Sequence, residues 1–188
     1  LNATGNLSLS ARNDLSITAA KSSHSGSANM ISGAMGNRTS SGLEEAGSRM
    51  AQVSGEWQQA QGSELNAGGN LLLSAGRDLT LTGSQASASG SARVQAGGDI
   101  RIGAETTTNT THLDANSSTS SVSNSRKEDR LLLSTLSGDK GVTLVAGNNL
   151  LAEGAQVDST EGRIGVSAQN VTIKDARASL VAQDSEDK

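Results

Sequence analysis

Residues 67–82 read Ala-Gly-Gly-Asn-Leu-Leu-Leu-Ser-Ala-Gly-Arg-Asp-Leu-Thr-Leu-Thr and contain one short unit twice. Each copy consists of a small residue, one or two glycines, an Asn or Asp, and then an apolar–x–apolar triplet. The triplets are Leu71–Leu73 and Leu79–Leu81. A period of two places the outer residues of a triplet on one face of a strand, and Gly with Asn or Asp favours a turn. The unit therefore predicts a turn followed by a short β-strand.

The unit recurs along the chain at two spacings. Leu71 and Leu79 are 8 residues apart, whereas Leu79 and Ile100, like Leu150 and Val171, are 21 apart. A spacing of 8 residues within a longer repeat of about 21 residues is typical of a solenoid. In such a fold each turn of the chain contains several short strands and lies above the previous turn. We therefore predict an all-β fold, a parallel β-helix in which Leu79 stacks on Ile100 and Leu150 on Val171. Further inward residues are expected at Leu7, Leu9, Leu15, Ile17, Val142, Leu144, Val157, Ile164, Val166, Ile173 and Leu180.

The composition of the 188 residues agrees with such a fold. The chain has no Pro, Cys, Phe or Tyr and a single aromatic residue, Trp57. Proline removes a hydrogen-bond donor from a β-ladder, so its absence suits continuous ladders. The net charge is −4 with scattered charges, and the concentrated basic surface expected of a nucleic-acid-binding protein is not visible. No apolar run approaches the ~20 residues of a membrane-spanning helix.

Two polar stretches interrupt the repeats. Repeat segments cover residues 1–19, 63–103 and 131–182, and the interruptions cover 20–62 and 104–130. We interpret the chain as one β-helix segment of a longer array, with the interruptions as excursions from it. They could be extended β-hairpins or disordered segments. Within Leu43–Ala60, apolar residues at a 3-4-3-4-3 spacing also allow a helix, which Gly47 and Gly55 weaken.

The repeats at residues 67–82, 96–100 and 141–150 resemble those of filamentous haemagglutinin-type exoproteins. Their alternation with Ser/Thr-rich interruptions resembles the second haemagglutinin repeat region of contact-dependent growth-inhibition proteins. The resemblance implies a right-handed parallel β-helix in a virulence-associated protein of a Gram-negative bacterium. It also implies secretion by an outer-membrane transporter of the two-partner type, and a location outside the cell or on its surface.

The sequence gives little support for a metal-binding or catalytic site. His24 and His112 are the only histidines, and His112 with nearby Asp114 is too small a set for a zinc site. Asn or Asp recurs at the turns, which could indicate calcium binding, but the tandem Gly-Gly-x-Gly-x-Asp pattern is missing. We therefore expect turn chemistry and a stacked side-chain ladder at Asn70, Asp78, Asp99, Asn149 and Asn170. No catalytic residue, cofactor or metal is expected, and the chain is not predicted to be an enzyme.

The function predicted from the sequence is that of a structural repeat segment in a large secreted surface fibre, either an adhesin or a toxin-delivery protein. The interruptions would contact a target or host cell surface, because solenoid rungs mainly provide a scaffold. The alternative is a glycan-binding or glycan-active β-helix. The candidate interaction residues all lie in the interruptions: Trp57, Met50, His112, Arg126, Lys127 and Arg130.

Overall fold

The computed structural model describes residues 1–33, 48–116 and 120–187, without the side chains of residues 30–33, 48–49 and 186–187. The chain forms two compact units. Unit 1 contains residues 1–21, 60–107 and 131–177, and unit 2 contains residues 22–59, 108–130 and 178–188. The sequence had suggested that the last repeat segment continues to residue 182, whereas unit 1 ends at Arg177.

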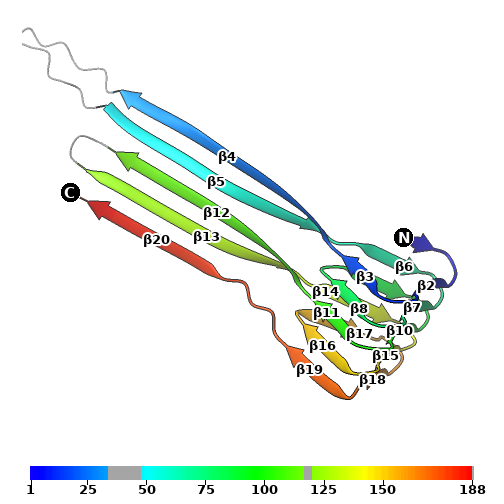
Figure 1. Cartoon of the computed structure of the whole chain (residues 1–188). Coiled ribbons are helices and arrows are strands. Elements are labelled where there is room, and N and C mark those ends of the chain that lie inside the picture. The colour runs from blue at the N-terminus through cyan, green and yellow to red at the C-terminus, as the bar shows by residue number, and fades with distance from the viewer. Residues whose placement is uncertain (34–47, 117–119, 188) are drawn as a thin grey trace, which may run out of the picture. The chain divides into compact units, whose positions relative to one another are not determined.

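Unit 1 is built from three parallel sheets of five strands each (Figure 1). Sheet A contains β1 (Asn2–Ala3), β6 (Glu64–Ala67), β9 (Gln85–Ala88), β14 (Ser134–Gly138) and β17 (Ala155–Asp158). Sheet B contains β2 (Leu7–Ala11), β7 (Leu71–Ala75), β10 (Ala92–Ala96), β15 (Val142–Ala146) and β18 (Ile164–Ser167). Sheet C contains β3 (Leu15–Thr18), β8 (Leu79–Thr82), β11 (Ile100–Gly103), β16 (Asn149–Glu153) and β19 (Asn170–Lys174).

One strand from each of sheets A, B and C makes a rung, and five rungs stack to form a parallel β-helix. Leu79 pairs with Ile100 and Leu150 with Val171, so the register predicted from the 21-residue spacing is confirmed. Rungs 1 to 5 begin with β1, β6, β9, β14 and β17, respectively.

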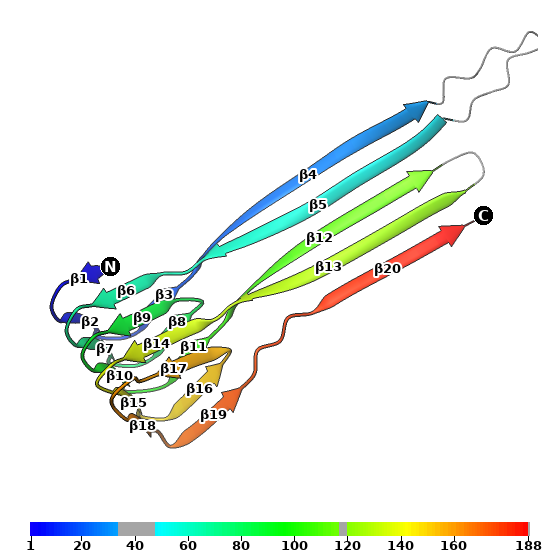
Figure 2. The same ribbon diagram turned by 180° about the vertical axis from the view of Figure 1, so that it is seen from behind.

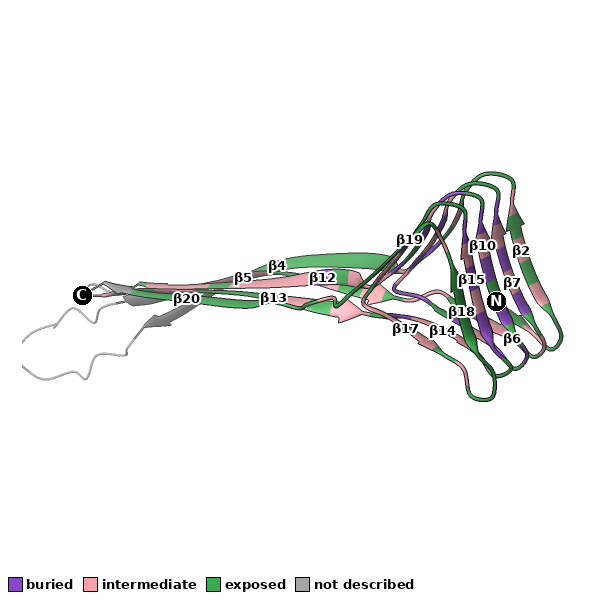
Figure 3. Ribbon diagram, turned by 90° about the horizontal axis from the view of Figure 1, so that it is seen from below, coloured by how far each residue is buried: buried purple, intermediate pink, exposed green. Residues whose placement is uncertain are grey.

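The interior of the β-helix is a narrow column of aliphatic side chains. Leu73, Ile100, Leu136 and Val142 have no measurable exposure, and the purple bands along β7, β10 and β15 in Figure 3 mark this core. This core forms because successive side chains of a strand point alternately inward and outward. In β7, whose sequence is Leu-Leu-Leu-Ser-Ala, the first, third and fifth residues are buried. The predicted inward positions are therefore correct for rungs 2 to 4.

At rung 5, Val157 packs against the core as predicted and is partly buried. The prediction of burial is wrong for the inward residues of β18 and β19, because no further rung of the described chain covers them. Ile164, Val166, Val171 and Ile173 are exposed, although they occupy inward columns of the stack. Leu180 was also predicted to lie inward. It instead lies in β20 (Leu180–Asp187), a strand of unit 2, and is exposed.

The corner that follows sheet C alternates between two kinds of connection. After rungs 2 and 4 the chain turns directly into sheet A through Gly83 (φ +56°) and Gly154 (φ +64°). Glycine is needed here because other residues rarely adopt this left-handed conformation. After rungs 1 and 3 the chain instead enters the two interruptions, at the ends of β3 and β11, and returns at β6 and β14. Both interruptions therefore leave from corresponding corners of the stack.

Unit 2 is one sheet, sheet D, whose strand order is β20–β13–β12–β5–β4 (Figure 2). Its other strands are β4 (Ala20–Gly33), β5 (Ser48–Gln61), β12 (Glu105–Asn116) and β13 (Ser121–Leu132). The pairs β5–β12 and β13–β20 are antiparallel. The described residues of the interruptions thus form mainly extended strands, as one of the interpretations predicted. Each interruption supplies two strands of sheet D, and the fifth, β20, follows rung 5.

The helical interpretation of Leu43–Ala60 is wrong for residues 48–60, which lie in β5. Leu43 and Ala46 are outside the described residues. The apolar spacing was helical, but Gly55 lowers helix propensity and pairing with Thr-rich β12 satisfies the backbone of β5 instead.

Candidate functional site

The six candidate interaction residues all lie on three neighbouring strands of sheet D. Met50 and Trp57 are in β5, His112 is in β12, and the three basic residues are in β13. They come from positions up to 80 residues apart in the sequence (Met50 to Arg130). The sheet, which only the tertiary structure reveals, therefore brings the predicted residues of both interruptions together.

The pairing distributes these residues over two faces. Residues two apart on a strand share a face, as do directly paired residues of neighbouring strands. Ser54 pairs with His112, so His112 lies on the face of Met50 and opposite Trp57. The Thr108 hydroxyl donates a hydrogen bond to Asp129 (2.7 Å), which places Lys127 on the face of His112. We call the first face the tryptophan face (Trp57, Arg126, Glu128, Arg130) and the second the histidine face (Met50, His112, Lys127).

On the tryptophan face, the indole ring of Trp57 lies over two glycines of adjacent strands. A Cβ atom added to Gly55 would lie 2.8 Å from Trp57 Cζ2, and one added to Gly26 would lie 3.5 Å from Cζ3. Glycine at both positions leaves room for the ring to lie across β5 and β4. The side chain stays 44% exposed. The result is a flat apolar platform that sequence reasoning missed, although Gly55-x-Trp57 at strand spacing was a signal for it.

Two arginines flank one carboxylate on the same face. Arg130 Nε donates a hydrogen bond to Glu128 Oε1 (3.1 Å), and Arg126 Nη2 lies 3.6 Å from Glu128 Oε2. Both arginine side chains remain more than half exposed. Glu128 neutralises one of the two charges and leaves a local excess of one.

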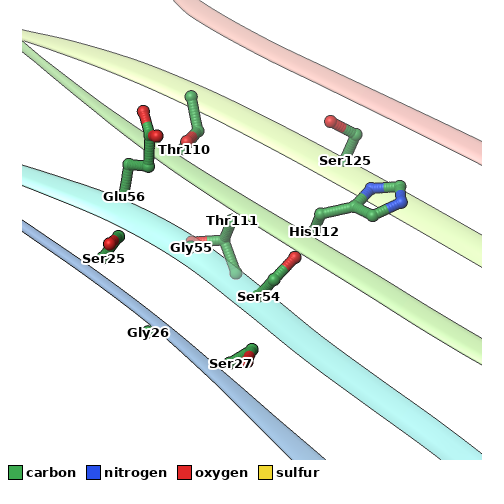
Figure 4. Close-up of a pocket in the computed structure, with 10 residues that line it drawn as sticks. All are labelled: Ser25, Gly26, Ser27, Ser54, Gly55, Glu56, Thr110, Thr111, His112 and Ser125. Atoms are coloured by element: carbon green, nitrogen blue, oxygen red, sulfur yellow. The ribbon is translucent and has the colours of Figure 1, made fainter.

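The histidine face contains a shallow open depression of about 630 Å³ (Figure 4). Small side chains on β4 and β5, including Ser25, Ser27 and Ser54, create it. Glu56 and His112 lie at its border, and Asp114 Oδ2 is 2.9 Å from His112 Nε2. The depression thus offers hydroxyl groups flanked by one carboxylate and one imidazole, a surface suited to polar contacts.

Asp129 links β13 to β12 and to the segment before β20 on this face. Hydrogen bonds donated by the hydroxyl groups of Ser179 and Thr108 hold the pKa of the Asp129 carboxyl below its ordinary value. The donors come from the segment before β20 and from β12, whereas Asp129 lies in β13. The carboxylate therefore helps to fix the order of these strands.

In unit 1 the turn residues form the expected ladder. Asp78 Oδ1 accepts a hydrogen bond from the backbone N–H of Asp99 (2.9 Å), and Asp99 Oδ1 accepts one from Asn149 (3.1 Å). Asn170 Nδ2 donates to Asn149 Oδ1 (2.9 Å). At the start of this column Arg77 donates to Asp14, which lowers the pKa of the Asp14 carboxyl. These side chains serve as caps between consecutive rungs.

We expect Asp78→Ala to lower the stability of unit 1 by about 1 kcal/mol, because it removes the acceptor of the Asp99 N–H. Asp78→Asn keeps an oxygen at the same place and should retain most of that stability. Thermal unfolding of both variants, followed by circular dichroism, measures the difference. Equal melting temperatures for Asp78→Ala and the unaltered chain would show that the ladder contributes nothing.

Metal binding is predicted to be unnecessary for folding. Within the described residues, no group of three or more His, Asp or Glu side chains is placed to hold a metal ion. The Asp78 and Asp99 oxygens used in the ladder already accept backbone hydrogen bonds. We expect the melting temperature to be unchanged when calcium and zinc are removed with a chelator or added back. A decrease of several degrees on chelation would contradict this prediction.

Comparison with known proteins gives one match. A family model described as "Hemagglutinin repeat" matches residues 1–116, which contain rungs 1 to 3, both strands of the first interruption and β12. No curated protein and no solved structure matches the chain. Among the described residues, no helix is long and apolar enough to cross a membrane.

Proposed function

Because the chain belongs to the hemagglutinin repeat family and is a repeat segment of a secreted, adhesin-like filamentous protein, we propose that its two units have different roles. Unit 1 is the scaffold, and sheet D of unit 2 is the surface through which the parent fibre contacts a target or host cell. The parent would reach the cell surface through an outer-membrane transporter of the two-partner type. We propose a binding role without catalysis or a cofactor.

The observation that carries this proposal is the exposure of large apolar side chains on sheet D. Trp57, Met50, Val122, Leu180 and Val181 are all exposed there. In rungs 2 to 4 of unit 1, by contrast, the inward Leu, Ile and Val residues of β7, β8, β10, β11 and β15 are buried. Exposed apolar side chains rimmed by polar residues are typical of interaction sites. The adhesin and toxin-delivery branches of the family would both use such a surface.

Deletion of the excursions tests the proposal. The design copies the direct connection Thr82–Gly83–Ser84. Residues 19–62 are replaced by a single glycine that joins Thr18 to Ser63. Residues 104–133 are replaced by a single glycine that joins Gly103 to Ser134. We expect the rungs to keep their β-sheet circular dichroism. Adhesion or toxin delivery by the parent protein should fall to the level of cells that lack it.

Face-specific variants provide the matched control for this deletion. One variant replaces Trp57, Arg126 and Arg130 with alanine, and the other replaces Met50, His112 and Lys127. Both leave the strands of sheet D in place, so a loss of binding in only one of them identifies the contacting face. If the parent protein binds and delivers normally after the double deletion, the excursions are spacers and the proposal fails.

A second candidate function is glycan binding, which the flat exposed platform of Trp57 favours. Aromatic rings offer a large rigid contact area with a defined face. Trp57 is the sole Trp and the chain has no Tyr, so its fluorescence reports on this face alone. Titration with a panel of oligosaccharides should shift the emission if a glycan stacks on the ring. An unchanged emission across the panel would leave the cell-contact proposal as the better one.

A further inference from the structure

The tryptophan face of sheet D carries two features of different chemistry, an apolar ring and a pair of guanidinium groups. The ring of Trp57 lies over Gly26 and Gly55 and is partly exposed. Arg126 and Arg130 are on β13, and β12 lies between that strand and β5, which carries Trp57. Two strand spacings amount to about 10 Å. A ligand that contacts both features must therefore extend across β12.

The part of β12 between these features presents small polar side chains. Thr111 is paired with Gly55, so Thr111 and Asn109 point to the tryptophan face. The side-chain oxygen of Asn109 accepts a hydrogen bond from the backbone N–H of Gln58 (2.8 Å), which holds this side chain toward β5. An extended ligand that crosses β12 would thus meet a hydroxyl and an amide and no large side chain.

The two arginines contact one carboxylate and have donors left for another. Arg130 Nε donates a hydrogen bond to Glu128, whereas Arg126 lies at ion-pair distance from it, 3.6 Å. A guanidinium group has several N–H donors. Among the described residues, no other acceptor pairs with either group. The arginine side chains are 56% and 67% exposed and that of Glu128 is 34% exposed, so the remaining donors face solvent.

Resting on the glycan-binding function above, we propose that the tryptophan face binds an acidic glycan. One sugar ring stacks on Trp57, and the carboxylate of a neighbouring sugar pairs with Arg126 or Arg130. A sugar ring presents C–H bonds on its flat side, which suit the negative face of an aromatic ring. A carboxylate is the group that both arginines already contact in Glu128, and it matches the planar guanidinium. The excess of one positive charge on this face favours an anionic ligand over a neutral one.

Calorimetric titration of the full chain with matched sugars tests the charge of the ligand. The probes are an oligomer of galacturonic acid and a galactose oligomer of the same length and linkage, which has no carboxylate. We expect the acidic oligomer to bind about fivefold more tightly at low salt, and this difference to decrease as salt is added. Saturation with the acidic oligomer should also shift the Trp57 emission. Equal affinities for the two oligomers, or binding without a shift in emission, would overturn the proposal.

A sulfated galactose oligomer of the same length distinguishes a carboxylate from negative charge in general. It should bind more weakly than the galacturonic acid oligomer, because the planar carboxylate fits a guanidinium group with two parallel hydrogen bonds. Tighter binding of the sulfated oligomer would refute the assignment of a carboxylate.

Glu128→Gln is the most specific variant because it releases both guanidinium groups from their present partner. It should tighten binding of the galacturonic acid oligomer by about threefold and leave binding of the galactose oligomer unchanged. Arg126→Gln combined with Arg130→Gln should reduce the affinity for the acidic oligomer to that for the neutral one. A purely structural role of these side chains would not change the two affinities in opposite directions.

The matched controls make the same changes of charge on exposed outward positions of unit 1. They are Glu153→Gln, and Arg93→Gln combined with Arg101→Gln. Both should bind the two oligomers like the unaltered chain, and a gain in Glu153→Gln equal to that in Glu128→Gln would contradict a local site. If no acidic oligomer binds but deletion of the excursions still abolishes adhesion, the ligand class is wrong and the cell-contact function stands.

Discussion

Replacing Leu150 with aspartate is expected to unfold unit 1 at temperatures where the unaltered chain is stable. Leu150 is 2% exposed and lies between Ile100 and Val171 in its column. An aspartate there would bury a charge without a partner, one of the few mechanisms that costs about 4 kcal/mol or more. The melting temperature, followed by circular dichroism, should decrease by tens of degrees or the transition should disappear.

Leu151→Asp is the matched control for this prediction. Leu151 is adjacent on β16 but points outward, in the column of Arg101 and Thr172, and is only partly buried. We expect its melting temperature to stay within a few degrees of the unaltered chain. If Leu150→Asp melts like Leu151→Asp, the assignment of inward and outward residues on sheet C is incorrect.

The second large effect is expected from Gly97→Ala at the corner between sheets B and C. Gly76, Gly97 and Gly147 form a column in which a Cβ atom on each would overlap the carbonyl oxygen of the residue one rung earlier. The oxygen facing Gly97 is that of Gly76, a backbone atom fixed by the ladder. Relief requires the rungs to separate, so we expect a loss of about 3 kcal/mol, the upper part of the usual range for overpacking.

Gly165→Ala controls for the general effect of adding a methyl group to a glycine. A Cβ on Gly165, in β18, would meet no atom within 4 Å. This change should leave stability equal or raise it slightly, because alanine restricts the unfolded chain. Urea unfolding of the two variants measures the contrast. Similar midpoints for Gly97→Ala and the unaltered chain would show that the close approach at Gly97 is not a constraint on the fold.

The repeat units of the sequence were enough to determine the β-helix and its register within the uninterrupted repeat segments. The spacing of Leu79 and Ile100 set the rung length, and period-two alternation set which side chains point inward. Both signals are local, because each rung contacts only the rungs next to it and repeats the same pattern. Burial was mispredicted at Val171 and Ile173, where the alternation is the same but nothing covers the rung.

The tertiary structure alone decided the arrangement of the interruptions. The apolar residues of 43–60 follow a helical spacing, but Gly47 and Gly55 weaken a helix and the composition is polar. Strand, helix and disorder were therefore all compatible with this sequence. Pairing of β5 with β12 and of β13 with β20 joins residues far apart in the chain, and no local pattern records such partners. Trp57 and Arg126 therefore share one face, and Met50 and His112 the other, because of antiparallel register between strands from different interruptions. That register depends on backbone hydrogen bonds between neighbouring strands of the sheet. These bonds join segments that are distant in the chain, so the sequence of one segment alone does not determine them.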